Sequence, residues 1–273
     1  MDERITLQNG IGIPKIGFGT WKIPDGEVVE EAVLSALEAG YRLIDTATIY
    51  GNESGVGSAI EKSAISRGKL FITTKLWNED QGFDETQAAF AKSLRVLQLE
   101  YLDLYLMHWP VTGKRLESWR AMEELYKSGQ VKSIGVSNFT VRHLEELLQH
   151  ANVVPAVNQV ELHPFLFDQQ KELLEFCRAH GIVVEAYSPL AHANRMNDKT
   201  VGELAEKYGK SNAQILLRWA VQRGTIPIPK STNRIRMKEN IEIFDFSIDD
   251  ADMNKLNNLG DNFRTCGDPN GME

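Results

Sequence analysis

The sequence predicts an α/β fold of the (β/α)8 TIM-barrel type. Short, mostly apolar runs rich in β-branched residues recur eight times along the 273 residues, and segments with apolar residues at helical spacing lie between them. Strands that are apolar on both faces indicate a parallel sheet covered by helices. A count of eight favours closure of that sheet into a barrel. No linker divides the chain, so we expect one domain over residues 1–273.

Each strand is expected where β-branched and aromatic residues cluster between turn residues. The expected strands lie at residues 15–21, 42–47, 70–77, 101–109, 131–138, 156–162, 182–188 and 225–230. The clearest helical patterns lie at residues 27–40, 84–98, 117–129 and 169–181. Several of these patterns end in glycine, the residue that is favoured just past a helix.

Two segments lie outside the repeat. Residues 4–16 have alternating apolar residues around Asn9-Gly10, which is a strong signal for a β-hairpin. We expect this hairpin to plug the bottom of the barrel. Residues 257–273 have weak periodicity, and we expect this C-terminal tail to run over the surface.

The composition argues against several classes of partner. A formal net charge of -8 disfavours nucleic acids and membrane surfaces, which are polyanions that select basic patches. Cys177 and Cys266 form neither a disulfide framework nor a metal-ligand spacing, so we expect a reducing compartment and no metal. No apolar run is long enough to span a bilayer or to act as a secretory signal. These features favour a cytoplasmic protein.

Polar side chains follow the expected strands at the end of the barrel where active sites form. They are Asp45, Tyr50, Lys75, His108, Ser137, Asn138, Gln159, Tyr187, Ser188, Lys230 and Ser231. Each residue alone has an ordinary structural explanation, such as a turn, a solvated lysine or a half-buried aromatic ring. The convergence of an aspartate, a tyrosine, a lysine and a histidine on one mouth favours an active site, because neighbouring titratable groups shift one another's pKa values.

These four residues could donate a proton to a carbonyl oxygen. A tyrosine with a pKa of roughly 10 is a poor donor at neutral pH, but a nearby ammonium lowers that pKa. Lys75 could supply the ammonium, and Asp45 could keep Lys75 protonated. His108 could orient the substrate oxygen. None of these groups supplies an electron pair for reduction, so a cofactor must deliver the hydride.

A separate anion site is expected near the last strand. The G-x-G segments of the sequence do not continue as a dinucleotide fingerprint, which disfavours a Rossmann fold. Residues 228–240 place Lys230, Ser231 and Arg236 where barrels often bind phosphate, before a helix. The alternative for this segment is an ordinary solvated loop.

Taken together, these motifs resemble those of the aldo-keto reductase family. GFGTW, DTATIYGNE, TTKLW, LYLMHWP, IGVSNF, NQVELHP, EAYSPL and IPKSTNRIRMKEN occur in the family order across the chain. The short loops and the tail sequence RTCGDP are most similar to the bacterial branch of small aldehyde reductases, which includes 2,5-diketogluconate reductase.

The resemblance implies NADPH-dependent reduction of aldehydes and ketones by a monomer, with Tyr50 as general acid. Small dicarbonyls, aromatic aldehydes and keto sugars are the implied substrates. The implied catalytic residues are Asp45, Tyr50, Lys75 and His108, and the implied substrate residues are Trp21, Tyr50, Trp77, His108 and Trp109. The implied cofactor residues are Gly19, Thr20, Trp21, Asp45, Ser137, Asn138, Gln159, Tyr187, Ser188, Leu190, Lys230, Ser231, Thr232, Arg236, Glu239 and Asn240.

Within the cofactor set the resemblance implies distinct roles. Ser137, Asn138 and Gln159 would hold the nicotinamide carboxamide, and Tyr187 would stack on the ring. Lys230, Ser231 and Arg236 would bind the 2'-phosphate, and Glu239 and Asn240 the adenine.

The sequence departs from the family pattern in two places. Residues 191–195 read AHANR where relatives often have glycine, which leaves the pyrophosphate contacts open. The loops around the expected pocket are short, so we expect an open site with broad substrate choice. The sequence also leaves two other classes of function open: a binding or structural protein on the same scaffold, and a Schiff-base aldolase that uses Lys75.

Overall fold

Eight parallel strands form the central sheet of the protein in a computed structural model that describes residues 3–272. They are β3 (Gly17–Gly19), β4 (Leu43–Asp45), β5 (Phe71–Leu76), β6 (Leu104–Met107), β7 (Ile134–Ser137), β8 (Val157–Glu161), β9 (Val183–Tyr187) and β10 (Ile226–Pro227). Neighbours in the sheet are also neighbours in sequence. The two edges meet where the amide of Gly19 donates to the carbonyl of Pro229 at 3.1 Å. The predicted (β/α)8 barrel is therefore confirmed.

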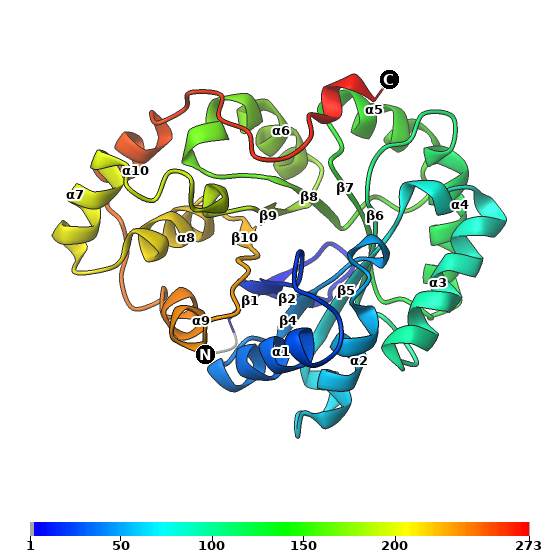
Figure 1. Cartoon of the computed structure of the whole chain (residues 1–273). Helices are drawn as coiled ribbons and strands as arrows, with labels where there is room; N and C mark the ends of the chain where they lie inside the picture. The colour runs from blue at the N-terminus through cyan, green and yellow to red at the C-terminus, as the bar shows by residue number, and fades with distance from the viewer. Residues whose placement is uncertain (1–2, 273) are drawn as a thin grey trace.

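Helices surround this sheet on the outside, as Figure 1 shows. They are α1 (Glu27–Ala39), α2 (Glu53–Lys62), α3 (Phe83–Leu97), α4 (Arg115–Lys127), α5 (Val141–His150), α6 (Phe167–Ala179), α7 (Lys199–Tyr208), α8 (Asn212–Gln222), α9 (Arg234–Ile241) and α10 (Asp250–Asn257). The four patterns singled out in the sequence correspond to α1, α3, α4 and α6, with ends that differ by one or two residues. No helix of the described chain is long and apolar enough to cross a membrane.

The periodicity of each helix explains where it packs. In α1, Val29, Val33 and Ala36 recur at helical spacing and are fully buried. The helix ends at Gly40, whose φ of 111° favours glycine. Most strand residues are buried on both faces, because one face lines the barrel interior and the other lies under the helices.

The predicted hairpin closes the bottom of the barrel. β1 (Arg4–Thr6) pairs antiparallel with β2 (Gly12–Pro14). Leu7 and Ile13 join the apolar layer inside the barrel, which contains Leu43, Phe71 and Leu104. At the turn, the side chain of Asn9 donates to the carbonyl of Lys132 at 2.9 Å. Hydrogen bonds and apolar packing therefore hold the plug in place.

The C-terminal tail crosses the opposite end of the barrel. After α10 it runs past α6 to the neighbourhood of α5, drawn in orange and red in Figure 1. The surface course agrees with the expectation, although Pro269 is buried and Thr265 and Cys266 are partly covered. Glu273 lies outside the described residues. Because the tail covers the end where parallel strands finish, it contributes to the candidate site.

Candidate active site

The four ionisable residues singled out in the sequence meet at the mouth of the barrel. Asp45 ends β4, Lys75 lies in β5, Tyr50 follows β4 in a short turn and His108 directly follows β6. The Lys75 ammonium donates to Oδ1 of Asp45 at 2.6 Å and to the carbonyl of Thr46 at 3.0 Å. It also donates to the phenol oxygen of Tyr50 at 3.3 Å. A lysine that is fully buried is thus held between a carboxylate and a phenol.

Burial and charge act in opposite directions on this group. Burial lowers the pKa of Lys75, but Asp45 and Tyr50 oppose it, and the net pKa lies above its usual value. Burial raises the pKa of Tyr50, and Lys75 lowers it only in part, so the net pKa is also raised. Lys75 does lower the pKa of Tyr50, as expected, but the expectation that the net pKa lies below its usual value is wrong. The reason is that desolvation of the phenolate outweighs the attraction of the ammonium.

His108 is buried against two aromatic rings. Its ring centroid lies 5.2 Å from that of Trp77 and 5.8 Å from that of Tyr50, both edge to face. Burial, together with the charge of Lys75, holds the pKa of His108 well below its usual range. A neutral imidazole carries one donor and one acceptor. His108 can therefore hydrogen bond a substrate oxygen at neutral pH without carrying a charge.

A second set of polar side chains lies beside the first, on or directly after β7, β8 and β9. The hydroxyl of Ser137 donates to the carbonyl of Gln159 at 2.8 Å. The amide nitrogen of Asn138 donates to the carbonyl of His108 at 3.0 Å, and the Tyr187 hydroxyl donates to Oδ1 of Asn138 at 2.8 Å. Asn138 has a φ of 64°, an uncommon left-handed conformation for a non-glycine residue. These bonds fix the side chains that face the cavity.

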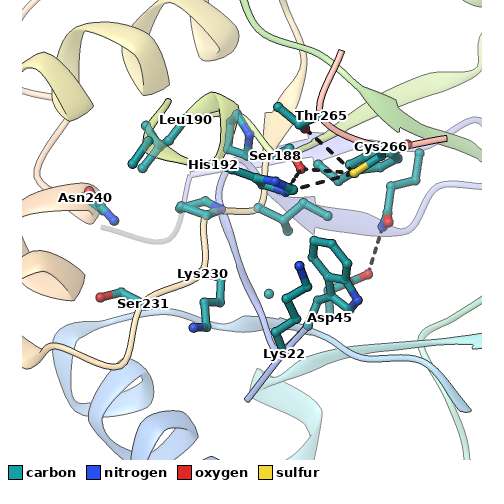
Figure 2. Close-up of a pocket in the computed structure, with 18 of the residues that line it drawn as sticks. Lys22, Asp45, Ser188, Leu190, His192, Lys230, Ser231, Asn240, Thr265 and Cys266 are labelled. Atoms are coloured by element: carbon teal, nitrogen blue, oxygen red, sulfur yellow. Dashed lines mark hydrogen bonds between the residues drawn. The ribbon is translucent and has the colours of Figure 1, made fainter. Parts of the chain in front are cut away.

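One large cleft, of about 1190 Å³, extends from this mouth to helix α9. The predicted residues that line it are Gly19, Trp21, Asp45, Tyr50, Trp77, His108, Trp109, Ser137, Asn138, Gln159, Tyr187, Ser188, Leu190, Lys230, Ser231, Thr232, Arg236, Glu239 and Asn240. Figure 2 shows Asp45 and Lys22 at one end, and Ser231 and Asn240 toward the other. The elongated shape suits a dinucleotide with its reactive ring at the barrel mouth.

The α9 end of the cleft has the chemistry of an anion site. Neither Lys230 nor Arg236 has an ion pair or a side-chain hydrogen bond among the residues that the structure describes, and both are exposed. Asn233 caps α9 by accepting from the amides of Ile235 and Arg236 at 2.9 and 3.1 Å. Two uncommitted cations beside a helix N-terminus fit a phosphate group. The residues present therefore fit NADPH, a dinucleotide with an extra phosphate.

Two predicted residues lie behind the cleft instead of lining it. Thr20 is buried, and its hydroxyl donates to the carbonyl of Asp45 at 3.0 Å, so its side chain is turned away from the cavity. Lys75 lies behind Tyr50. At the far end, Glu239 lines the cleft but accepts a hydrogen bond from Ser211. Gly19 and Trp21 on either side of Thr20 line the cleft, and the sequence motif alone does not tell which residue of this segment faces the cavity.

Several lining residues were not expected from the sequence. They are Lys22, Ile49, Pro189, His192, Ala193, Met196, Asn197, Ser211, Asn212, Ala213, Ile228, Pro229, Asn233, Thr265, Cys266 and Gly267. Those from the tail are placed by Glu161, whose carboxylate accepts from the amide of Thr265 at 2.7 Å and from that of Cys266 at 3.1 Å. Glu161 belongs to the NQVEL run and is buried. It was not identified from the sequence; an acid within this largely apolar run is the signal that could have done so.

Two residues of the AHANR segment, His192 and Ala193, line the cleft. Ala191, His192 and Ala193 all have positive φ, between 48° and 63°, as does Ser188 at 48°. Each such residue costs energy that the surrounding contacts must offset. The His192 ring provides some of these contacts: its Nε2 lies 2.9 Å from Oγ of Ser188, and its centroid lies 5.3 Å from that of Trp21. Figure 2 shows this group beside Cys266.

Comparisons with known proteins agree with the geometry. The model of the aldo/keto reductase family matches residues 15–261. Glyoxal reductase of Bacillus subtilis is 49% identical over 98% of this chain and 97% of its own length. Methylglyoxal reductase DkgA of Salmonella typhimurium is 45% identical over 97% of this chain and 96% of its own length.

A solved structure extends the comparison to the fold and the cofactor. The aldo-keto reductase of Bombyx mori, in complex with NADP, superposes with a TM-score of 0.91 at 38% identity, covering 97% of this chain and 94% of that one. The protein therefore belongs to the aldo/keto reductase family, as an oxidoreductase that reduces carbonyl groups with NADPH.

Proposed function

We propose that the protein reduces small aldehydes and ketones, with dicarbonyls such as glyoxal and methylglyoxal first among them, and that Tyr50 donates the proton. The observation that carries this proposal is the Asp45, Lys75 and Tyr50 chain, which begins inside the barrel and ends in the cleft. The names of the two bacterial relatives support the substrate class. NADPH, when bound, supplies the hydride.

The proton side of the reaction follows from the residues at the mouth. Because the pKa of Tyr50 is raised, the phenol stays protonated at neutral pH and is present as an acid in every turnover. As the substrate oxygen gains negative charge, Lys75 favours transfer of the phenol proton by stabilising the tyrosinate. His108, held neutral, can hydrogen bond the same oxygen and keep it near the phenol.

The substrate end of the cleft is apolar and open. Trp21, Trp77 and Trp109 line it together with Ile49 and Cys266. Trp21 and Ile49 are among the few large apolar side chains that are exposed in the described chain, at 37% and 47%. Flat aromatic walls and few polar partners accept different carbonyl compounds of small size. Broad specificity, with aromatic aldehydes and keto sugars as further substrates, is therefore part of the proposal.

We further propose a single-domain monomer that works in the cytoplasm. The exposed large apolar residues of the described chain, Trp21, Val28, Ile49 and Ile235, do not share one element. Cys177 and Cys266 are both free thiols, which suits a reducing compartment. Light scattering coupled to size exclusion tests the monomer directly: a mass near 30.8 kDa supports it, and twice that mass contradicts it.

The decisive experiment for the activity is Tyr50→Phe. This variant keeps the ring but removes the acidic proton, so we expect kcat with methylglyoxal to fall at least about 10³-fold. NADPH binding, followed by protein fluorescence, should stay within about threefold of wild type. Activity near the wild-type level would contradict the role of Tyr50, while absence of activity in the wild-type protein would contradict the proposed substrates.

Two other classes of function are less well supported by the site. A Schiff-base aldolase needs a lysine that the substrate can reach, whereas Lys75 has no exposed surface and is held by Asp45. Borohydride should therefore trap no substrate on the protein. A purely structural role on the same scaffold gives no reason for an intact proton-donating group, and it predicts no NADPH consumption with any carbonyl compound.

A further inference from the structure

A buried acid that the proposed mechanism does not use lies beneath the cleft. Glu185 is in β9, two residues before Tyr187, and has no exposed surface. Its Oε2 accepts a hydrogen bond from Nε2 of Gln159 at 2.8 Å. Its Oε1 is buried and has no hydrogen-bond partner among the described residues. Burying a charged carboxyl group without partners for both oxygens is costly in free energy, so an acid in such a place is uncharged or is retained for a function.

The same amide nitrogen also contacts the catalytic group. Nε2 of Gln159 donates to Oδ2 of Asp45 at 2.8 Å, while Oδ1 of Asp45 accepts from Lys75. One amide group therefore bridges two carboxyl groups and uses both of its N–H bonds. Gln159 and Glu185 are register partners in β8 and β9, and Asp45 lies in β4, elsewhere in the same barrel.

This bridge fixes which way the Gln159 amide faces. If the amide were flipped, its oxygen would face the carboxylate of Asp45, the ion-pair partner of Lys75, and the contact would be repulsive. With the nitrogen held by Asp45 and Glu185, the carbonyl oxygen is the part that remains for the cleft, which Gln159 lines. The side-chain oxygen of Gln159 is therefore a hydrogen-bond acceptor that faces the cleft in one fixed orientation.

We propose that Glu185 is a positioning residue of the reductase, which acts through Gln159 on Asp45 and so sets the upper pH limit of proton donation by Tyr50. The inference rests on the proposed role of Tyr50. It adds a fifth member to the chain of contacts that runs from Tyr50 through Lys75, Asp45 and Gln159.

The direction of the effect follows from the charges around Glu185. Asp45 from β4 and Lys75 from β5 are the charged groups that act on it, Gln159 from β8 is neutral, and Ile226, its register partner in β10, is apolar. Burial, followed by repulsion from Asp45, raises the pKa of Glu185 to about 8. Below that pH the acid is neutral, and above it a second negative charge develops beside Asp45.

A negative charge on Glu185 favours the protonated forms of Lys75 and Tyr50, which lie on the other side of Asp45. Additional negative charge raises the pKa of the Lys75 ammonium and of the Tyr50 phenol, which keeps Tyr50 protonated to higher pH. A side chain at position 185 that cannot ionise should therefore move the alkaline limb of the pH profile of kcat to lower pH. A residue that only fills space would not move this limb.

The test compares three variants of the full-length protein with wild type. Glu185→Gln keeps the shape and an acceptor but cannot ionise, and Glu185→Leu removes the acceptor. Glu53→Gln is the matched control: Glu53 is another buried acid with a raised pKa, but its partners are Thr74 and Ser93, outside the chain of contacts. The pH dependence of kcat is measured from pH 5.5 to 10 with saturating NADPH and methylglyoxal.

We expect kcat of Glu185→Gln at pH 6.5 to stay within about threefold of wild type, and its alkaline limb to move down by roughly half a pH unit. For Glu185→Leu we expect kcat to fall about tenfold, because Gln159 loses one of its two partners. The limb of Glu53→Gln should coincide with that of wild type. A Glu185→Gln profile that coincides with wild type, or an equal shift in Glu53→Gln, would overturn the inference.

A spectroscopic measurement tests the state of Glu185 without turnover. Infrared difference spectra between pH 6.5 and 9.5 should show loss of a carboxylic acid C=O band in wild type and in Glu53→Gln, but not in Glu185→Gln. The same band change in Glu185→Gln would contradict the assignment. Because this readout needs no substrate, it separates failure of the inference from failure of the proposed reductase activity, and the isosteric glutamine variant suffices if the leucine variant does not fold.

Discussion

The ammonium of Lys75 lies 2.6 Å from a carboxylate oxygen of Asp45, and both side chains are almost completely buried. An ion pair in such a place is not a general source of stability, because removing two charges from water costs about as much as their attraction returns. What the pair provides is a fixed positive charge beside the phenol of Tyr50. Both charges are buried, despite the unfavourable free energy of desolvation, at the point where the proposed chemistry needs them.

Loss of one partner of this pair should therefore be strongly destabilising. Lys75→Met leaves the Asp45 carboxylate buried without its ion-pair partner, and we expect the free energy of unfolding to fall by about 3–5 kcal/mol. Urea denaturation followed by circular dichroism measures this change. Reductase activity should be lost as well, since Tyr50 no longer has an ammonium beside it.

The double variant Lys75→Met/Asp45→Asn separates the two effects. It removes both charges, so most of the lost stability should return while activity stays absent. If the double variant were as unstable as Lys75→Met alone, the destabilisation would come from packing and not from the unpaired charge.

His108 should make the native state sensitive to mild acid. Its pKa in the folded protein is well below the usual value, so it binds a proton in the unfolded chain at a higher pH than in the native state. Stability that comes from the neutral form is complete above about pH 6.5, the usual histidine pKa, and is lost as the pH falls below it, by up to about 1.4 kcal/mol per pH unit.

Urea unfolding of wild type and His108→Asn at pH 7.5 and 5.5 checks this expectation. The other histidines are the same in both proteins, so the difference between the two pH dependences isolates His108. Wild type should lose more stability on acidification than the variant. Parallel losses would show that His108 is not held neutral in the fold.

The convergence of Asp45, Tyr50, Lys75 and His108 was predictable from the sequence because barrel topology converts strand ends into neighbours. Asp45, Lys75 and His108 lie at or just past the ends of three consecutive strands, and parallel pairing of β4, β5 and β6 brings them together whatever the loops do. Tyr50 was identified with them because only a short turn separates it from β4. For such residues, the local sequence pattern and the overall fold predict the same position in the site.

The rest of the site depends on contacts that no local pattern contains. The tail reaches the mouth because Thr265 bonds to Glu161, which is 104 residues earlier in the chain. Glu185 lies in the apolar run IVVEAYS, where alternation alone does not tell whether the acid faces the barrel interior or the helices. The sign of the Tyr50 pKa shift also required the degree of burial, which the sequence does not provide.

The C-terminal tail should become more mobile when its hydrogen bonds to Glu161 are weakened. In Glu161→Gln the carboxylate that accepts from Thr265 and Cys266 becomes a neutral amide with only one acceptor oxygen. We expect faster hydrogen exchange over residues 259–272 and a KM for aromatic aldehydes about three to ten times higher, since the tail lines the substrate end.

Glu175→Gln, an exposed acid on α6, is the control for the tail variant, and it should change neither measurement. NADPH binding should stay within about twofold in both proteins. Unchanged hydrogen exchange in Glu161→Gln would mean that other contacts hold the tail.

Cofactor choice should depend on one arginine of α9 and not on its neighbour. Arg236 lines the cleft and has no protein partner among the described residues, whereas Arg234, on the same helix, lies outside the cleft 3.5 Å from Glu38. A guanidinium pairs well with a phosphate, and NADH lacks the 2'-phosphate, so we expect Arg236→Ala to weaken NADPH binding about 10- to 100-fold and NADH binding much less. Fluorescence titrations of both cofactors measure the ratio, and Arg234→Ala should keep the wild-type ratio. Equal losses for the two cofactors in Arg236→Ala would place the phosphate elsewhere in the cleft, with Lys230 as the next residue to replace.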